Sequence, residues 1–334
     1  KIDEWISMLP FMPDMSGELS TDMKIAYKGN QFWGEGDVEL KDYKYEGERV
    51  GDFNLNALMT LDPKTGNTNL ESYMNVNGAR VMFAAGVLND STATSPMSLK
   101  LDIDKFPIST VTAFIPNGIA ELQGYLNGEM SMSGSFDKPI LTGVVKAEDG
   151  AIYVPMFGSK ILFPSTDIPV DSGIVKLNKY ALLSCNDKPL VIDGHIDIRD
   201  MSNAYVDMSI RGRNVQFVDS KQIKKSQLFG RGFANVDATA KGRLSALYVN
   251  ANVALLSGSN LTYVLQDDVS EIVTETNPDM VHFVQFDDST SVYGDSLLQN
   301  QSFGMSINAS LTLQQGNAIN AYLSTDGKNR VQVQ

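Results

Sequence analysis

The chain has 334 residues, of which 43% are hydrophobic, and its formal net charge at pH 7 is −13. The hydrophobic content is that of an ordinary folded protein and argues against a disordered chain. The acidic charge argues against a nucleic-acid backbone as partner, because such binding needs a basic face. No apolar run approaches the roughly 18 residues that cross a membrane as a helix.

Residues 1–15 place apolar side chains, among them Trp5 and Leu9, at helical spacing before Pro10 and Pro13. This spacing predicts a short amphipathic helix or linker ahead of the main domain. The chain begins at Lys1 and ends within an alternating run. We therefore expect a fragment of a longer protein, whose targeting and anchoring segments lie elsewhere.

From residue 16 onward apolar and polar residues alternate, which predicts strands with one apolar and one polar face. Before Gly118 we expect strands over 16–27, 33–40, 53–61, 70–77, 79–88 and 97–103. Residues 62–67 predict a turn, and Asn77-Gly78 predicts a tight hairpin. Residues 108–115 are ambiguous between a short helix and a strand.

After Gly118 the alternation is more regular. We expect strands over 121–133, 140–147, 151–155, 174–177, 180–185, 190–198, 204–215, 234–244, 247–256, 260–265, 303–313, 318–323 and 330–334. Residues 266–300 break the rhythm and predict an irregular excursion. Glycines recur 108 residues apart, which indicates a duplicated group of strands. The repeated pairs are Gly124 and Gly232, Gly134 and Gly242, and Gly150 and Gly258.

Alternation alone does not distinguish a closed sandwich from an open trough. Small residues on the apolar side of the strands favour the trough, because they let a sheet fold tightly about its long axis. About twenty strands of about eight residues, ~4.8 Å apart, would extend on the order of 90–100 Å, and open sheets of that length curl. We predict an all-β fold for residues 16–334, a continuous, elongated antiparallel sheet curled into a U-shaped trough with a hydrophobic inner groove.

The apolar side of the alternation defines the expected lining of this groove. The predicted lining residues are Leu99, Leu101, Ile103, Leu122, Leu126, Met130, Met132, Ile192, Ile196, Ile198, Val206, Met208, Val249, Val253 and Leu255. The glycines predicted to permit its curvature are Gly124, Gly128, Gly134, Gly194 and Gly242. Ordinary barrel corners or bulges are the alternative explanation of these glycines.

Cysteine and histidine usage gives no sign of catalysis or metal binding. Cys185 has no partner for an internal disulfide, and we expect a small buried hydrophobic residue. His195 lies on the polar side of its strand, and it and His282 are too few and too distant for a familiar His/Cys metal site. We therefore expect no metal and no cofactor.

A series of short motifs follows Gly118 in fixed order. It consists of Leu-x-Gly-x-Leu-x-Gly over 122–128, Ser133-Gly134, Pro-x-Leu-x-Gly over 139–143 and Gly-x-Ile-Tyr-Val-Pro over 150–155. This series resembles the C-terminal domain of the TamB family, within the AsmA-like superfamily. The resemblance is clear over residues 115–334, and residues 230–264 are similar to the versions found in Bacteroidota.

The resemblance implies a taco-shaped β-sheet with a hydrophobic groove, part of a protein anchored in the inner membrane. Such proteins cross the periplasm and dock on a TamA or BamA-type outer-membrane barrel. The resemblance implies outer-membrane biogenesis, by carriage of phospholipid or other acyl chains between the membranes. The alternative is an assembly chaperone for outer-membrane proteins or autotransporters, which would add nascent strands to an open sheet edge. The family offers no catalytic residues to carry over.

Two other classes have weaker support. A β-helical glycoside hydrolase would need two facing carboxylates. The pairs Asp267-Asp268 and Asp287-Asp288 lie in loop-like sequence, so we do not expect an enzyme. An adhesin or carbohydrate-binding module would need aromatic residues on the polar face, where Tyr125 and Tyr205 lie scattered.

Overall fold

The computed structural model describes residues 14–28, 31–88, 96–115, 120–135, 138–200, 203–221, 228–264, 305–322 and 330–333. Within these residues the chain is nearly all β-strand, and every strand belongs to one 19-stranded sheet. The predicted all-β fold is confirmed. The N-terminal helix and the excursion over 266–300 lie outside the described residues.

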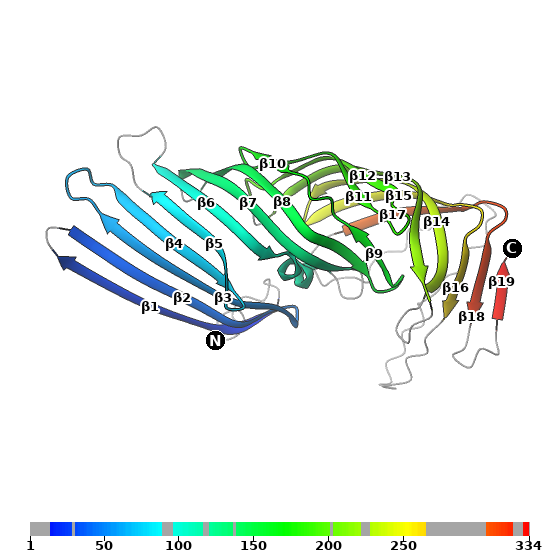
Figure 1. The fold of residues 1–334 in the computed structure, drawn as a ribbon, viewed down its shortest axis with the longest axis horizontal. Coiled ribbons are helices and arrows are strands. Elements are labelled where there is room, and N and C mark those ends of the chain that lie inside the picture. Colours follow the sequence, from blue (N-terminus) through cyan, green and yellow to red (C-terminus); the bar gives the residue numbers. More distant parts are fainter. Residues whose placement is uncertain are drawn as a thin grey trace.

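The first part of the sheet is a meander in which each strand pairs antiparallel with the next (Figure 1). The strands are β1 (Met15–Lys28), β2 (Gln31–Tyr45), β3 (Glu48–Leu61), β4 (Thr68–Val76), β5 (Ala79–Val87), β6 (Met97–Pro107), β7 (Glu121–Ser135) and β8 (Lys138–Val154). Asn77 and Gly78, with φ of 50° and 81°, form the predicted tight turn between β4 and β5.

The ambiguous segment is a 3₁₀ helix, η1 (Ile108–Phe114). η1 lies beside the part of β2 and β3 that extends past the ends of the shorter strands β4 and β5. There Ala113 packs with Tyr45 and Val50 in a small buried cluster. Thr112 Oγ1 accepts a hydrogen bond of 2.9 Å from the Leu122 N–H, which ties η1 to the start of β7.

The second part continues the antiparallel order. It contains β9 (Ser159–Leu162), β10 (Ile168–Asp171), β11 (Ile174–Leu183), β12 (Pro189–Asp197), β13 (Tyr205–Ser220) and β14 (Leu228–Arg243). β9 and β10 are short strands that both lie between β8 and β11. Likewise β15 (Ala246–Leu255) and β16 (Asn260–Val264) pair with successive parts of β14.

The sheet departs from the antiparallel order at its end. β17 (Met305–Leu313) runs parallel to β15, and β18 (Ala318–Tyr322) runs parallel to β16 before β19 (Arg330–Val333) returns antiparallel. Parallel neighbours need a crossover connection of a dozen or more residues. Residues 265–304, which contain the predicted excursion, provide the length for this return.

Many strands are longer than the predicted eight residues, because they continue through β-bulges where the alternation breaks. β8 has 17 residues and β13 and β14 have 16 each, so the predicted strand ends at 147 and 177 are wrong. In four bulges, two polar residues of one strand lie opposite a single residue of the next strand. The second residue of each polar pair has a φ between 46° and 53°. The N–H of that residue donates to the opposite side chain at 2.7–2.9 Å, in the pairs Asp42–Asp52, Lys105–Asn127, Lys179–Asp193 and Asn214–Asn235.

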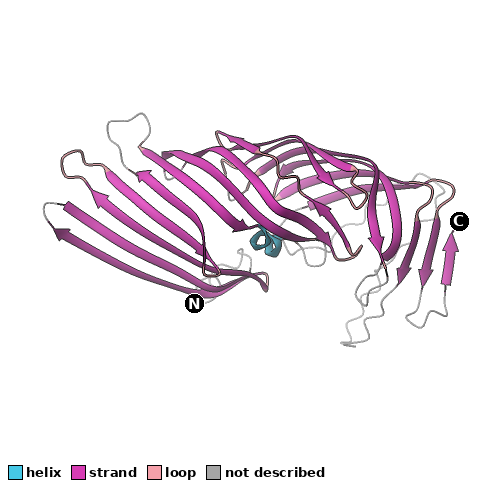
Figure 2. Ribbon diagram, in the orientation of Figure 1, coloured by secondary structure: helices cyan, strands magenta, loops and turns pink. Residues whose placement is uncertain are grey.

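The bulges preserve the apolar face of the sheet. In β6, Asp104 and Lys105 separate Ile103 from Phe106, yet Ile103 pairs with Gly128 and Phe106 pairs with Leu126. The extra residue therefore keeps apolar positions on one face while it bends the strand and increases its twist. Figure 2 shows the result, a long sheet whose strands are tilted and curved.

Candidate functional site

One row of cross-strand neighbours follows the sheet from β1 to β15. The row, here named the inner row, is Met23, Gly36, Ala57, Ser72, Ala84, Leu101, Met130, Gly143, Val170, Val175, Ile196, Val206, Gly242 and Leu247. Ser72 is its one polar side chain, and the Ser72 Oγ donates to the Asn56 carbonyl at 2.8 Å. Because directly paired residues share a face, one face of the sheet has an unbroken row of uncharged residues from β1 to β15.

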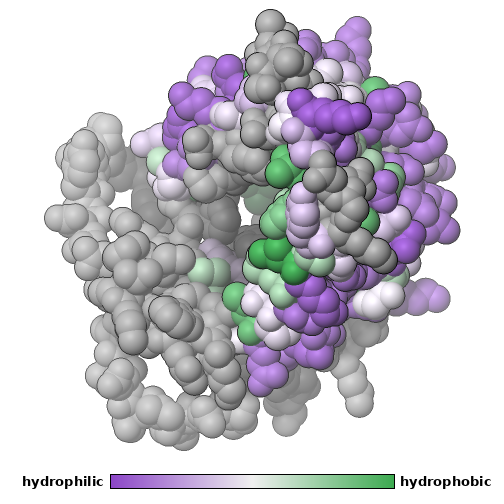
Figure 3. Space-filling model, turned by 90° about the vertical axis from the view of Figure 1, so that its left-hand side faces the viewer, coloured by the Kyte–Doolittle hydropathy of each residue, from purple (hydrophilic) through white to green (hydrophobic). Residues whose placement is uncertain are grey.

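Two further apolar rows flank the inner row in the first half of the sheet. One contains Leu99 and Met132, which pair with each other, and the other contains Ile103, which pairs with Gly128. In the second half one such row contains Met208 and Val249, both paired with Ala240. Seen from the β1 end, hydrophobic side chains gather beside a hollow while hydrophilic side chains cover the outer surface (Figure 3).

The predicted lining residues share this face but differ in exposure. Leu99, Leu101, Val206 and Leu255 are buried by the protein itself. Leu255, 3% exposed, belongs to a packed cluster with Val218 and Leu261, so it has little surface to offer a ligand. Ile198 lies just beyond the end of β12. The remaining predicted residues are partly exposed, namely Ile103, Leu122, Leu126, Met130, Met132, Ile192, Ile196, Met208, Val249 and Val253.

The glycines predicted for curvature lie where neighbouring backbones approach closely. At Gly124, Gly128, Gly134, Gly194 and Gly242 an added Cβ would lie under 3.0 Å from a carbonyl oxygen of the adjacent strand. Only glycine permits such an approach without displacement of the backbone. Gly134 and Gly242, one repeat apart, meet the carbonyls of Lys138 and Ala246, which are also one repeat apart.

Gly36 of the inner row is different, because an added Cβ there would meet nothing within 4 Å. Gly36 and Gly34 line an apolar hollow of about 190 Å³ with Met23, Ile25 and Met59. Met23 and Ile25 are 69% and 65% exposed. The β1 end of the inner face is therefore open and uncovered by other described residues. Sequence reasoning missed this part of the groove, although the alternation over residues 16–40 indicates it.

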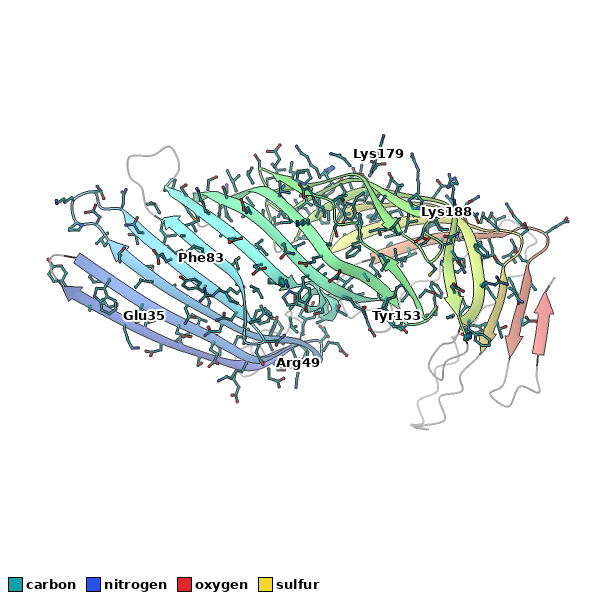
Figure 4. The ribbon with its side chains drawn as sticks, viewed as in Figure 1. Glu35, Arg49, Phe83, Tyr153, Lys179 and Lys188 are labelled. Carbon is teal, nitrogen blue, oxygen red and sulfur yellow. The ribbon has the colours of Figure 1, made fainter. Side chains whose placement is uncertain are left out.

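The outer face is polar and carries the charges of the sheet. His195 pairs across the sheet with Asp207 on this face, and Lys241 lies 2.8 Å from the Asp207 carboxylate. The hydrogen bonds that Arg199 donates to Asp197 lower the pKa of Asp197 to about 2. In Figure 4 side chains extend from both faces of the strands on which they are drawn. The inner row and the charged outer-face residues thus differ in chemistry.

The described residues contain no group of three or more His, Cys, Asp or Glu side chains suited to a metal ion. Nor does any helix in that part of the chain have the length and hydropathy to span a membrane. Cys185 is a free thiol that is partly exposed, with its Sγ 3.7 Å from the Lys160 carbonyl oxygen. The expectation of a buried Cys185 is wrong, because the residue lies in the turn after β11 rather than within the strand.

Residues 183–329 match the family model of the TamB C-terminal domain. The chain carries a TamB C-terminal domain. This match supports the resemblance to the TamB family, which the motif series over residues 122–155 predicted from a part of the chain outside the matched residues. No curated protein and no solved structure matches the chain.

The TamB match begins at the last residue of β11 and covers β12 to β18. Strands β1 to β10 lie outside the match, yet they belong to the same sheet, and all of them except β9 contribute to the inner row. The TamB match associates the chain with outer-membrane biogenesis, a TamA-type outer-membrane partner and a periplasmic, membrane-bridging location. The similarity to Bacteroidota versions remains a prediction.

Proposed function

We propose that this chain carries phospholipid between the inner and outer membranes, with acyl chains against its inner face. The inner row is the main support, because its residues are uncharged from β1 to β15. Polar headgroups would remain in water at the open side of the trough. A TamA or BamA-type barrel is the proposed docking partner.

The energetics suit movement along the groove. Burial of a methylene group is worth about 0.8 kcal/mol, so on the order of ten methylenes against the inner face give about 8 kcal/mol. Ordering of the lipid offsets part of this gain. Because similar apolar side chains recur at every strand, the attraction changes little from one position to the next. A lipid therefore meets no single deep site that would stop it.

A charge in the inner row tests the proposal. Met130 lies in the inner row, whereas the next residue, Ser131, is exposed on the outer face between Lys100 and Thr142. We expect Met130→Asp to reduce extraction of a fluorescent phospholipid from vesicles more than tenfold, because an acyl chain would have to desolvate the carboxylate. Ser131→Asp places the same charge on the same strand and should change extraction less than twofold.

Both variants should keep the β-sheet circular-dichroism spectrum of the parent protein. Normal phospholipid extraction by a folded Met130→Asp variant would contradict the proposal. If Met130→Asp does not fold, Val249→Asp on β15, with Asn250→Asp as its outer-face control, provides the same comparison.

The β1 edge favours a second candidate, an assembly chaperone for outer-membrane proteins. Within the described residues β1 pairs with β2 and with no other strand, and its Met23 and Ile25 are exposed. A strand added to this edge would extend the inner rows by one position. A photo-crosslinker at Thr21 on β1 should then capture nascent outer-membrane protein strands, whereas one at Asn56 on the interior strand β3 should not. Crosslinks at Thr21 to acyl chains alone would contradict strand addition.

A further inference from the structure

The outer face carries an aromatic pair that the lipid groove does not use. Tyr73 on β4 and Phe83 on β5 are direct cross-strand partners, with ring centroids 4.9 Å apart and an interplanar angle of 33°. The Arg80 guanidinium carbon lies 4.1 Å from the centre of the Tyr73 ring. Tyr73 pairs with Asn56 and Phe83 pairs with Asp102, so both rings lie on the polar face.

These aromatic side chains line a hollow. Its volume is about 410 Å³, and Asp102 and Asp104 of the neighbouring strand β6 also line it. A second hollow of about 500 Å³ shares Asp102 and Asp104 and continues over β7 and β8 to Asn127 and Lys146. The outer face therefore has an aromatic platform at one end of a polar depression that crosses β4 to β8. Figure 4 labels Phe83 on β5 at this position.

The polar groups of the depression are available to a ligand. On the same face the Asp37 carboxylate accepts hydrogen bonds from the side-chain amides of Asn54 and Asn56 at 2.7 and 2.6 Å. Asp102 and Asp104 have no such partner within the described part of the chain, and both are exposed. They are hydrogen-bond acceptors beside an aromatic ring, with Arg80 as a donor.

We infer that this outer-face depression binds a neutral glycan. A sugar ring presents C–H groups to an aromatic face and hydroxyl groups to carboxylates and a guanidinium, which is the set of groups found here. Asp102, Asp104, Glu129 and Asp167 outnumber the cations Arg80 and Lys146 in the two hollows. This excess of negative charge repels acidic polysaccharides and selects neutral ones.

The test uses chitotetraose, a neutral tetramer of N-acetylglucosamine, and saturation-transfer NMR with the whole chain. We expect a saturation-transfer signal that Phe83→Thr reduces more than tenfold, because the aromatic platform is lost while threonine retains strand propensity. Tyr248→Thr is the matched control. Tyr248 is 61% exposed on the outer face of β15, away from the depression, and its replacement should leave the signal unchanged.

Absence of a chitotetraose signal, or a signal that Phe83→Thr leaves intact, would overturn the inference. Preferential binding of the cationic glucosamine tetramer would also overturn it, because the carboxylates alone would then account for binding. If Phe83→Thr does not fold, the exposed substitution Asp102→Asn should still weaken chitotetraose binding. Phospholipid extraction should be normal in all of these variants, so failure of this inference is distinguishable from failure of the lipid proposal.

Discussion

Replacement of Gly194 by alanine tests the structural basis of the trough. Gly194 has a φ of 142°, and an added Cβ would lie under 3.0 Å from the Asp207 carbonyl oxygen and the Met208 Cα. Backbone conformations of this kind cost a non-glycine residue of order 1–3 kcal/mol. Since the adjacent strand must also move, we expect Gly194→Ala to lower the free energy of unfolding by about 2–4 kcal/mol.

Gly36 provides the matched control, because it lies in the inner row and an added Cβ there has open space. Glycine within a strand costs roughly 0.5–1 kcal/mol relative to alanine, so Gly36→Ala should be neutral or stabilising by about that amount. Urea unfolding followed by circular dichroism measures both variants. Equal effects of the two substitutions, or an unchanged unfolding midpoint for Gly194→Ala, would show that the close approach of the strands does not require glycine.

Three other substitutions follow from single contacts. Asn127→Ala removes the acceptor of the 2.7 Å hydrogen bond from the Lys105 N–H at the β6 bulge, and urea unfolding should show a loss of about 1 kcal/mol. Leu255→Ala opens a cavity in a packed cluster and should cost about 2–5 kcal/mol by the same measurement. Arg199 lowers the pKa of Asp197 from 3.8 to about 2, so this carboxylate stabilises the fold above about pH 4 and the contribution disappears as the pH falls towards 2. Melting temperatures of the parent protein and Asp197→Asn should therefore converge between pH 5 and pH 2, and a constant difference would contradict the assignment.

The sequence predicts the architecture well because alternation has a direct structural cause. A period of two assigns each side chain to a face without knowledge of the neighbouring strands. The Asn77-Gly78 hairpin was also predictable, because tight hairpin turns need residues that adopt positive φ. The lining residues Met130 and Ile196 follow from the same period, and the register brings them into one row across intervening strands.

Strand ends and strand partners were less predictable. The break in alternation at Leu177-Asn178-Lys179-Tyr180 suggests the end of a strand. In the structure these residues form a bulge, which is stabilised by the Asp193 side chain of the next strand. That acceptor is 14 residues away, so the local sequence does not reveal it. β17 likewise pairs in parallel with β15 although β16 comes between them in the chain, and the alternation within the two strands does not reveal this partner.

The exposure of individual lining residues could not be predicted from the sequence either. Leu255 and Val253 occupy the same face of β15, yet Leu255 is buried under Val218 and Leu261 while Val253 remains partly exposed. Alternation identifies the face of a side chain, whereas burial depends on residues from other strands. A choice of lipid-contact residues therefore needs the three-dimensional structure.

Native mass spectrometry of the purified chain measures whether the inner face holds phospholipid. We expect phospholipid bound to the parent protein and to Asn250→Asp, which carries its charge on the outer face. We expect fewer bound phospholipid molecules on Val249→Asp, whose charge lies on the inner face beside Ala240. Absence of phospholipid from the parent protein, or equal retention by a folded Val249→Asp variant, would contradict a lipid-carrying groove.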